Sequence, residues 1–135
     1  MAYSHDLAHW TYTGRAEAGE NVCVLVAGDE YVMLHSPDNG IGLKRSTDLR
    51  AWRDDGLLTL GQAGWPWARG RLTAGFALDL RHEPDIGKYV LFFHGSGPED
   101  ERTPFDTRAS VGIAWSDDLH DWHWPGEGVP HAGAL

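Results

Sequence analysis

The chain of 135 residues has a formal net charge of −9, a hydrophobic content of 41% and seven tryptophans. This length and apolar content are typical of one folded domain and not of a disordered segment. The acidic balance and the lack of a lysine or arginine cluster exclude binding to a nucleic-acid backbone. The sequence contains no run of about 18 apolar residues, so no membrane span is predicted. The single cysteine, Cys23, excludes an internal disulfide and a thiolate metal cluster.

Residues 1–14 are expected to end a preceding unit and to contain only its last strand or two. Residues 15–56 are expected to form one four-stranded antiparallel meander, because short apolar or alternating runs are separated by turn signals. These turn signals are Gly28-Asp29 and the run 37–40, whose Asn-Gly pair suits a tight hairpin. The strands of this unit are predicted at 21–26, 30–36, 41–46 and around 51–53.

Residues 57–126 repeat this plan with longer loops, and the tail 127–135 shows no pattern. The connection at 95–108 is polar and rich in glycine and proline, and loops of this length are often functional. No long stretch has the 3.6-residue periodicity of a helix. The strands of this unit are predicted at 73–82, 88–94, 109–116 and 121–124.

One motif recurs three times, at 4–14, 46–56 and 116–126. Each copy reads Ser-x-Asp-Leu-x-x-Trp and has a glycine four residues after the tryptophan. Such recurrence, with strand-rich sequence between the copies, predicts an all-β fold of four-stranded antiparallel blades that form a partial β-propeller. We expect each aspartate to hold a turn by accepting backbone N–H bonds, and each leucine and tryptophan to wedge between neighbouring sheets.

Two longer strings carry a resemblance to a known family. GIGLKRSTDLRAWRDDG, and GKYVLFFHGSG followed by ASVGIAWSDDLHDWHWPG, resemble blades of the five-bladed β-propeller glycoside hydrolases of families 43 and 32 and their relatives. The resemblance covers most of residues 1–126 and is specific for the blade and much less so for the substrate. It implies a partial propeller that lacks the inner strands of its first blade.

The resemblance also implies a chemistry, in which carboxylates on the innermost strands surround the mouth of a central channel. The first strands of the two units supply Glu20 and Asp79 as the candidate catalytic carboxylates. Glu20 would suit the acid if burial raised its pKa, and Asp79 would suit an orienting carboxylate. The alternatives are a solvated loop residue for Glu20 and a satisfied polar group for Asp79. The catalytic base of the family has no matching position in this sequence.

Five further residues are candidates for binding a sugar: Arg81, His94, Trp65, Trp67 and Asn39. The arginine could hold a carboxylate or a sugar hydroxyl, and the tryptophans could stack on a sugar face. A packed loop that covers the blade edge is the alternative for the tryptophans, and ordinary turn chemistry is the alternative for the asparagine. The histidines show no metal-ligand spacing in the inner strands, so we expect neither a metal site nor a cofactor.

The sequence therefore predicts a glycoside-hydrolase-like propeller protein that acts on or binds an oligosaccharide, with catalysis left open. The alternatives are a non-catalytic carbohydrate-binding module and an inactive propeller fragment that acts by oligomerisation. Because two blades alone leave apolar faces open, a homo-oligomer formed through these faces is expected. No basic region and apolar core of a signal peptide is visible, so the expected location is cytoplasmic.

Overall fold

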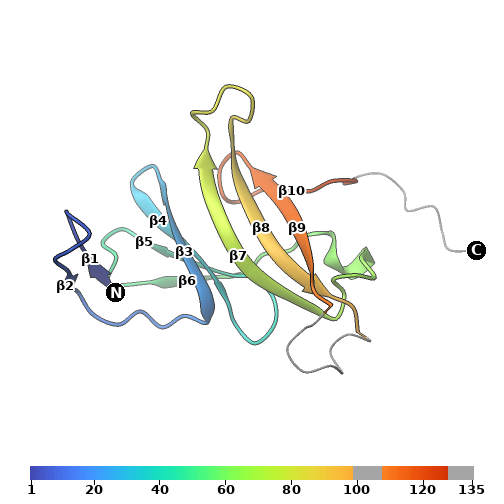
Figure 1. Ribbon diagram of the computed structural model, residues 1–135, viewed down its shortest axis with the longest axis horizontal. Helices are drawn as coiled ribbons and strands as arrows, with labels where there is room; N and C mark the ends of the chain where they lie inside the picture. Colours follow the sequence, from blue (N-terminus) through green and yellow to red (C-terminus); the bar gives the residue numbers. More distant parts are fainter. Residues whose placement is uncertain (99–107, 128–135) are drawn as a thin grey trace, which may run out of the picture.

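The computed structural model describes residues 1–98 and 108–127, and most of the predicted loop at 95–108 and of the tail at 127–135 lies outside these residues. The described part consists of two four-stranded antiparallel sheets that pack face to face and a two-stranded hairpin (Figure 1). This confirms the all-β fold of meander blades expected from the sequence. No helix in the described ranges is long and apolar enough to cross a membrane.

The first sheet is a meander whose strands follow one another in chain order. Its first two strands are joined by a two-residue turn, in which Gly28 has a φ of 65°. A positive φ at this position gives the turn the twist of the flanking strands, and glycine adopts it without strain. The strands of the first sheet are β3 (Glu20–Ala27), β4 (Glu30–Ser36), β5 (Gly42–Ser46) and β6 (Arg53–Leu57).

The second sheet repeats this order, and a short 3₁₀ helix, η1 (Gly61–Gly64), lies in the connection between the two. Its first strand has a register irregularity between Ala74 and Phe76, as the first strand of the other sheet has between Glu20 and Cys23. The strands of the second sheet are β7 (Arg71–Leu80), β8 (Lys88–Ser96), β9 (Ser110–Ser116) and β10 (Trp122–His123).

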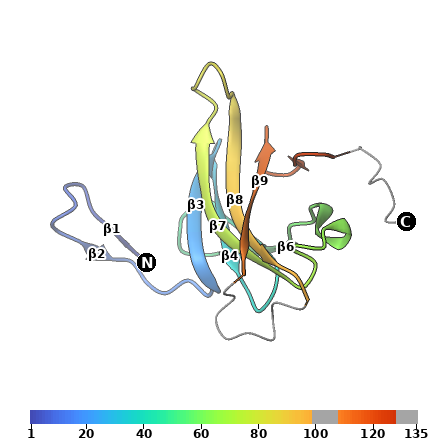
Figure 2. The same cartoon turned by 45° about the vertical axis from the view of Figure 1, so that its right-hand side comes forward.

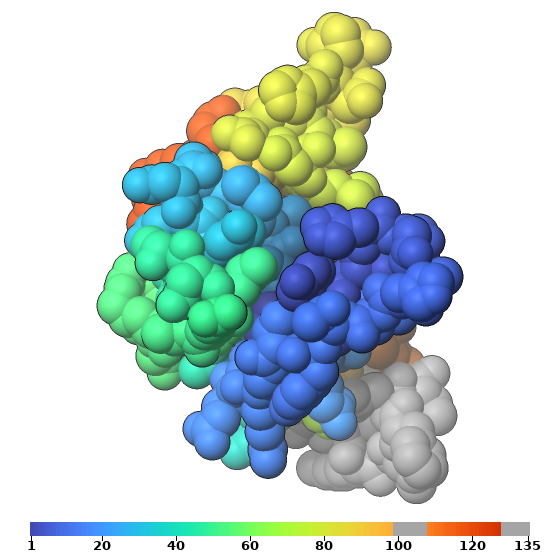
Figure 3. Space-filling model, turned by 90° about the vertical axis from the view of Figure 1, so that its left-hand side faces the viewer, coloured from blue at the N-terminus to red at the C-terminus, as the bar shows by residue number. Residues whose placement is uncertain are grey.

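The N-terminal hairpin consists of β1 (Ala2–Tyr3) and β2 (Thr11–Tyr12) and surrounds the first copy of the motif. By their distance from the motif, these strands correspond to the third and fourth strands of a sheet. Figure 2 shows the hairpin standing apart from the two sheets, and Figure 3 shows it as a dark-blue lobe beside the first sheet. The hairpin is thus the outer half of a blade.

The core lies between the facing sides of the two sheets. On the second sheet, small side chains at Ala74, Ala77 and Ala114 are almost fully buried and let the sheets approach closely. Two polar contacts cross the same interface: the Cys23 thiol lies 3.3 Å from the carbonyl oxygen of Ala77, and the Tyr89 hydroxyl donates to the carbonyl of Val26. The apolar residues of the first sheet that belong to this core are Cys23, Leu25, Val32, Leu34 and Leu43.

The three motif copies form the same turn, which we call the corner. In the third corner the hydroxyl of Ser116 accepts the backbone N–H groups of Asp118 and Leu119, and one Asp118 oxygen accepts two further backbone N–H groups. These bonds hold the pKa of the Asp118 carboxyl below its usual value. The same bonds occur in the other two corners, and the three leucines share a left-handed φ of 61–63°. The structural role expected for the motif aspartates is therefore confirmed.

The surroundings of the corners differ, which corrects the expectation that every leucine and tryptophan would wedge between sheets. Leu119 and Trp122 of the third corner are 0% and 5% exposed, whereas Leu7 and Trp10 of the first corner are 80% and 59% exposed. The third corner packs against the first sheet, and the first corner has no sheet of the described chain in front of it. The turn is therefore set locally, and its burial is set by the preceding sheet.

A buried arginine fixes the third corner to the first sheet. Arg45 on β5 donates to the carbonyl oxygen of Leu119 at 3.1 Å and forms an ion pair of 2.6 Å with Asp55 on β6. Glu30 lies 3.6 Å from the same guanidinium. These hydrogen bonds and ion pairs compensate for burying the charge. The hydrogen bond from Arg45, together with one from Arg53, holds the pKa of Asp55 below its usual value.

The corners supply a matched pair of variants. Leu119→Ala should lower the free energy of unfolding by about 2–5 kcal/mol, because it opens a cavity in the core. Leu7→Ala should change it by less than about 0.5 kcal/mol, because that side chain is exposed. Both leucines have the same φ, so the backbone contribution cancels. Urea unfolding followed by tryptophan fluorescence measures the two values, and similar values would contradict the corner packing.

Candidate functional site

A groove of about 410 Å³ lies where β3 and β7 begin. The two strands lie side by side and both begin at the lower end of the sheets in Figure 1. The groove brings together two carboxylates, Glu20 and Asp38, and one guanidinium, Arg71. Its remaining lining residues are Gly19, Ser36 and Pro37. This set of acceptors and donors, at the start of the first strand of each sheet and in the turn after β4, is the candidate functional site.

The backbone around Glu20 is tightly held. The Gly19 N–H donates to the Nδ1 atom of His35 at 3.0 Å, and a Cβ atom at Gly19 would collide with the backbone carbonyl of Ser36. Asn21 has a left-handed φ of 53°, and its side-chain amide donates to the Ser36 hydroxyl at 3.4 Å. A positive φ at a non-glycine residue is uncommon and persists where the surroundings enforce it. Glu20, which lines the groove, thus begins β3 on a constrained backbone.

His35 supports this strand start from inside the first sheet. It is buried, and its ring packs so closely on Gly42 that no side chain could be accommodated there. Burial lowers the pKa of His35, with Lys44 adding to the effect and Asp54 opposing it. Because Nδ1 accepts the Gly19 N–H, the neutral form with its proton on Nε2 fits this contact.

Asn39, the neighbour of Asp38 in the turn at 37–40, joins the two sheets. Its side-chain NH₂ donates to the carbonyl of Gly70 at 3.1 Å, and its side-chain oxygen accepts the N–H of Leu72 at 2.9 Å. The N–H of Gly40 donates to the Leu72 carbonyl at 2.7 Å. The amide of Asn39 is therefore engaged in holding the sheets together, which gives it a structural role.

The structure does not bring Asp79 to Glu20. Asp79 lies eight residues beyond Arg71 on β7, which is about 26 Å along a strand. Its carboxylate forms a bidentate pair with Arg81, and the Arg81 guanidinium lies 4.3 Å from the centre of the Tyr89 ring. The hydrogen bonds from Arg81 lower the pKa of Asp79 to about 2. Asp79 and Arg81 form an ionised cluster at the far end of the sheets.

The two candidate tryptophans belong to an aromatic cluster. Trp65 and Trp67 stack with ring centres 5.3 Å apart, and both stack on Phe93 at 5.9 and 6.0 Å. A Cβ atom at Gly95 or Gly112 would come within 2.8 or 2.7 Å of the Trp67 ring. Trp65 is buried, and both rings line a separate groove of about 240 Å³ that shares no lining residue with the Glu20 groove.

The remaining candidate, His94, is exposed on β8 and pairs with Thr73 and Val111. It does not line the Glu20 groove. In residues 1–98 and 108–127, no three histidine, cysteine, aspartate or glutamate side chains gather in a way that could hold a metal ion.

Sequence reasoning missed Arg71 and placed Asp38 in the turn at 37–40, beside the sugar-binding candidate Asn39, without naming it as a site residue. Asp38 follows β4 and comes near Glu20 because Glu20 pairs with Ser36, whereas Arg71 opens β7 and reaches the groove because β7 packs beside β3. A usable signal was present: Arg71 opens the first strand of the second unit, as Glu20 opens that of the first. First positions of inner strands meet at one end of a propeller, so they could have been compared directly.

The fold has solved counterparts. The GH43 endo-arabinanase from Bacillus licheniformis superposes with a TM-score of 0.58 at 13% identity, over 79% of this chain and 36% of that one. The native arabinanase from Bacillus subtilis gives 0.58 at 15%, over 80% and 37%. An exo-β-1,3-galactanase from Clostridium thermocellum gives 0.53 at 19%, over 77% and 22%. No family model and no curated protein sequence matches the chain.

These likenesses show the fold. The two sheets have the fold of blades in the β-propellers of GH43 arabinanases and galactanases, as the resemblance in the sequence implied. The chain spans about a third of the length of the two arabinanases. It therefore corresponds to part of such a propeller.

His35 predicts a dependence of stability on pH. Its pKa is lower in the folded chain, so the unfolded chain binds a proton first as pH falls, and folding weakens below about 6.5, the reference value for histidine. The contribution of neutral His35 to the stability of the folded chain is complete above that pH, and it is lost as pH falls through the folded pKa. The motif aspartates cannot cause this slope, because their lowered pKa values lie below 3.8.

Urea unfolding between pH 7.5 and 5 measures this effect, with His35→Gln as the comparison, since glutamine keeps an acceptor but does not titrate. We expect a flatter dependence in the variant. Equal slopes in the two proteins would remove His35 from the pH response.

Proposed function

We propose that this chain is part of a glycoside-hydrolase-like propeller and binds an oligosaccharide in the Glu20 groove. The observation that supports this proposal is that Glu20, Asp38 and Arg71 line one groove, which lies where the inner strands β3 and β7 begin. The fold shared with arabinanases and galactanases supports a carbohydrate as the ligand.

The groove has the chemistry that sugar hydroxyl groups require. Carboxylates accept hydrogen bonds from hydroxyls, and the guanidinium of Arg71 can donate to hydroxyl oxygens. The net charge of −9 disfavours an acidic polysaccharide. We therefore propose a neutral oligosaccharide, with arabinan and β-1,3-galactan fragments as the first ligands to test because those polymers are acted on by the structural counterparts.

Hydrolysis is the second candidate function and needs a second carboxylate. Carboxyl groups that cleave a glycosidic bond stand about 5–5.5 Å apart in retaining enzymes and about 6.5–9.5 Å apart in inverting enzymes. Asp79 is far outside this range from Glu20. Asp38 lines the same groove, so a hydrolytic activity of this chain would pair Glu20 with Asp38.

Calorimetric titration with arabino- and β-1,3-galacto-oligosaccharides tests binding. Glu20→Gln should weaken the binding of the preferred sugar at least about fivefold, since one charge-assisted hydrogen bond contributes roughly 1.5–3 kcal/mol in a buried setting and less in an open groove. Asp79→Asn is the matched control and should leave the affinity unchanged. Equal losses in both variants, or no binding of either sugar class by the wild-type chain, would overturn the proposal.

Aryl arabinoside and galactoside substrates separate catalysis from binding. If Glu20 and Asp38 act as the catalytic pair, Glu20→Gln and Asp38→Asn should each reduce turnover by at least about 100-fold, the scale of one general acid or base. Binding without turnover in the wild type would select the carbohydrate-binding alternative.

A homo-oligomer is a separate proposal, because it depends on the outer faces of the sheets and not on this groove.

A further inference from the structure

The second sheet presents an apolar surface on the side that faces away from the first sheet, which we call the open face. Phe76 is 58% exposed, and Phe92 and Ile113 are also exposed. One end of the surface is hollowed into a groove of about 480 Å³ that includes Val90 and Trp115 in its lining. No other element of the described chain packs on it. A contiguous exposed apolar surface of this kind marks an interaction site.

The open face corresponds to the side of the first sheet that is already covered. Tyr31 aligns with Tyr89 and Ser46 with Ser116, because both pairs occupy matching positions in the strand registers. The open face is made of Phe76, Leu78, Val90, Phe92, Ile113 and Trp115. Their counterparts on the first sheet are, in the same order, Cys23, Leu25, Val32, Leu34, Leu43 and Arg45.

On the first sheet, this covered side receives the third corner. Arg45 donates to the carbonyl of Leu119, and Leu119 and Trp122 are buried beside it. The contact is therefore one between the corner of one blade and the side of the preceding blade that faces this corner. The open face is the equivalent side of the second sheet.

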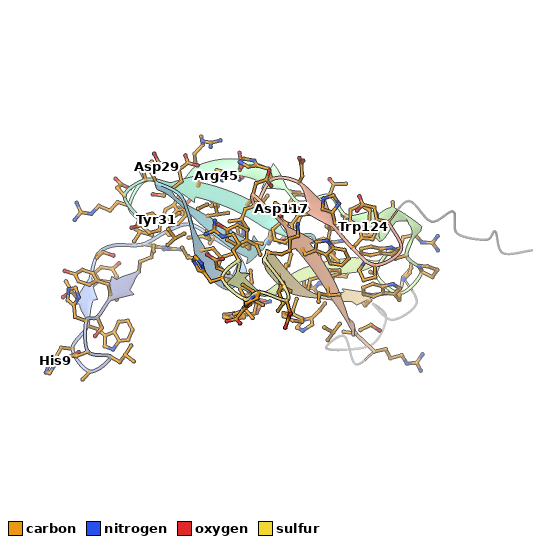
Figure 4. The ribbon with its side chains drawn as sticks, turned by 90° about the horizontal axis from the view of Figure 1, so that it is seen from above. His9, Asp29, Tyr31, Arg45, Asp117 and Trp124 are labelled. Atoms are coloured by element: carbon orange, nitrogen blue, oxygen red, sulfur yellow. The ribbon has the colours of Figure 1, made fainter. Side chains whose placement is uncertain are left out.

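The chain also carries a corner without a sheet to receive it. The first corner has the same turn hydrogen bonds as the third, and Leu7 shares its left-handed φ with Leu119, yet Leu7 and Trp10 are exposed. Figure 4 shows His9 of this corner at the end of the hairpin, far from both sheets. Tyr3 and Tyr12 on the flanking strands are exposed as well.

We propose that the first corner of one copy docks on the open face of a second copy, in the way that the third corner docks on the first sheet. Leu7 and Trp10 enter the place that Leu119 and Trp122 occupy within the chain. Trp115 occupies the position on the second sheet that Arg45 occupies on the first. In the contact between copies, an apolar ring with one N–H donor therefore replaces the buried ion pair of Arg45. A second copy suffices as the partner, because a single chain carries both surfaces.

The contact joins two different surfaces, so it is head-to-tail. Each copy keeps one corner and one open face available for a further copy. This property separates the proposal from a symmetric dimer, in which one surface meets itself.

Sedimentation velocity on the whole chain tests the proposal over about 1 to 100 μM, the range in which a weak interface dissociates. The wild type should shift from monomer to larger species. Trp10→Lys and Ile113→Lys should each abolish or strongly weaken the shift, because a charge would be buried in the contact. Val26→Lys is the control: this exposed residue lies on the other side of the first sheet, and its variant should associate like the wild type.

Mixing the two disrupted variants is the decisive measurement. The intact corner of Ile113→Lys can dock on the intact open face of Trp10→Lys, so the mixture should form a dimer that neither variant forms alone. Circular dichroism establishes that both variants are folded. A wild type that stays monomeric at every concentration, a Trp10→Lys variant that associates normally, or a mixture that remains monomeric would overturn the proposal.

Discussion

The structure depends on one contact, in which the corner of a blade packs on the side of the preceding blade that faces it. The corner alone is a local turn, held by serine and aspartate side chains that bind its backbone N–H groups, and it forms equally in all three copies. It contributes to the core only where a sheet receives its leucine and tryptophan. Burying a leucine fully stabilises a protein by about 1.5–3 kcal/mol, so the third corner holds the sheets together and the first does not.

The same contact determines where the functional groups meet. With the sheets face to face, β3 and β7 begin at one end, and the backbone bonds around Asn39 and Gly40 close that end. Glu20 and Arg71 then lie on one groove, although 50 residues separate them in the chain. The far end of β7 carries Asp79, which is neutralised by Arg81 just beyond the strand. One end of the stack thus carries the candidate groove, and the other carries an ion pair formed within the chain.

Much of the fold could be predicted, because its determinants are local. Apolar runs with turn signals such as Gly28-Asp29 specify strands, and the strands expected at 30–36 and 109–116 are observed almost unchanged. The last strand of the first sheet was misplaced: the residues after Asp48 still belong to the corner, since its carboxylate binds the N–H groups of Arg50 and Ala51, and pairing resumes only at Arg53. The candidate site was predicted less well, with Glu20 placed in the groove and Asp79 remote from it.

The sequence by itself determined the strands, the corners and their repetition, because each of these depends on residues within a few positions of one another. Only the tertiary structure decided which copies of a residue type are equivalent in environment. Leu7 and Leu119 share a motif and a backbone conformation but differ completely in burial, and Glu20 and Asp79 share a strand class but lie at opposite ends. The physical reason is that the burial of a side chain and its distance from a residue on another sheet depend on how two sheets pack, which the sequence of one sheet does not specify.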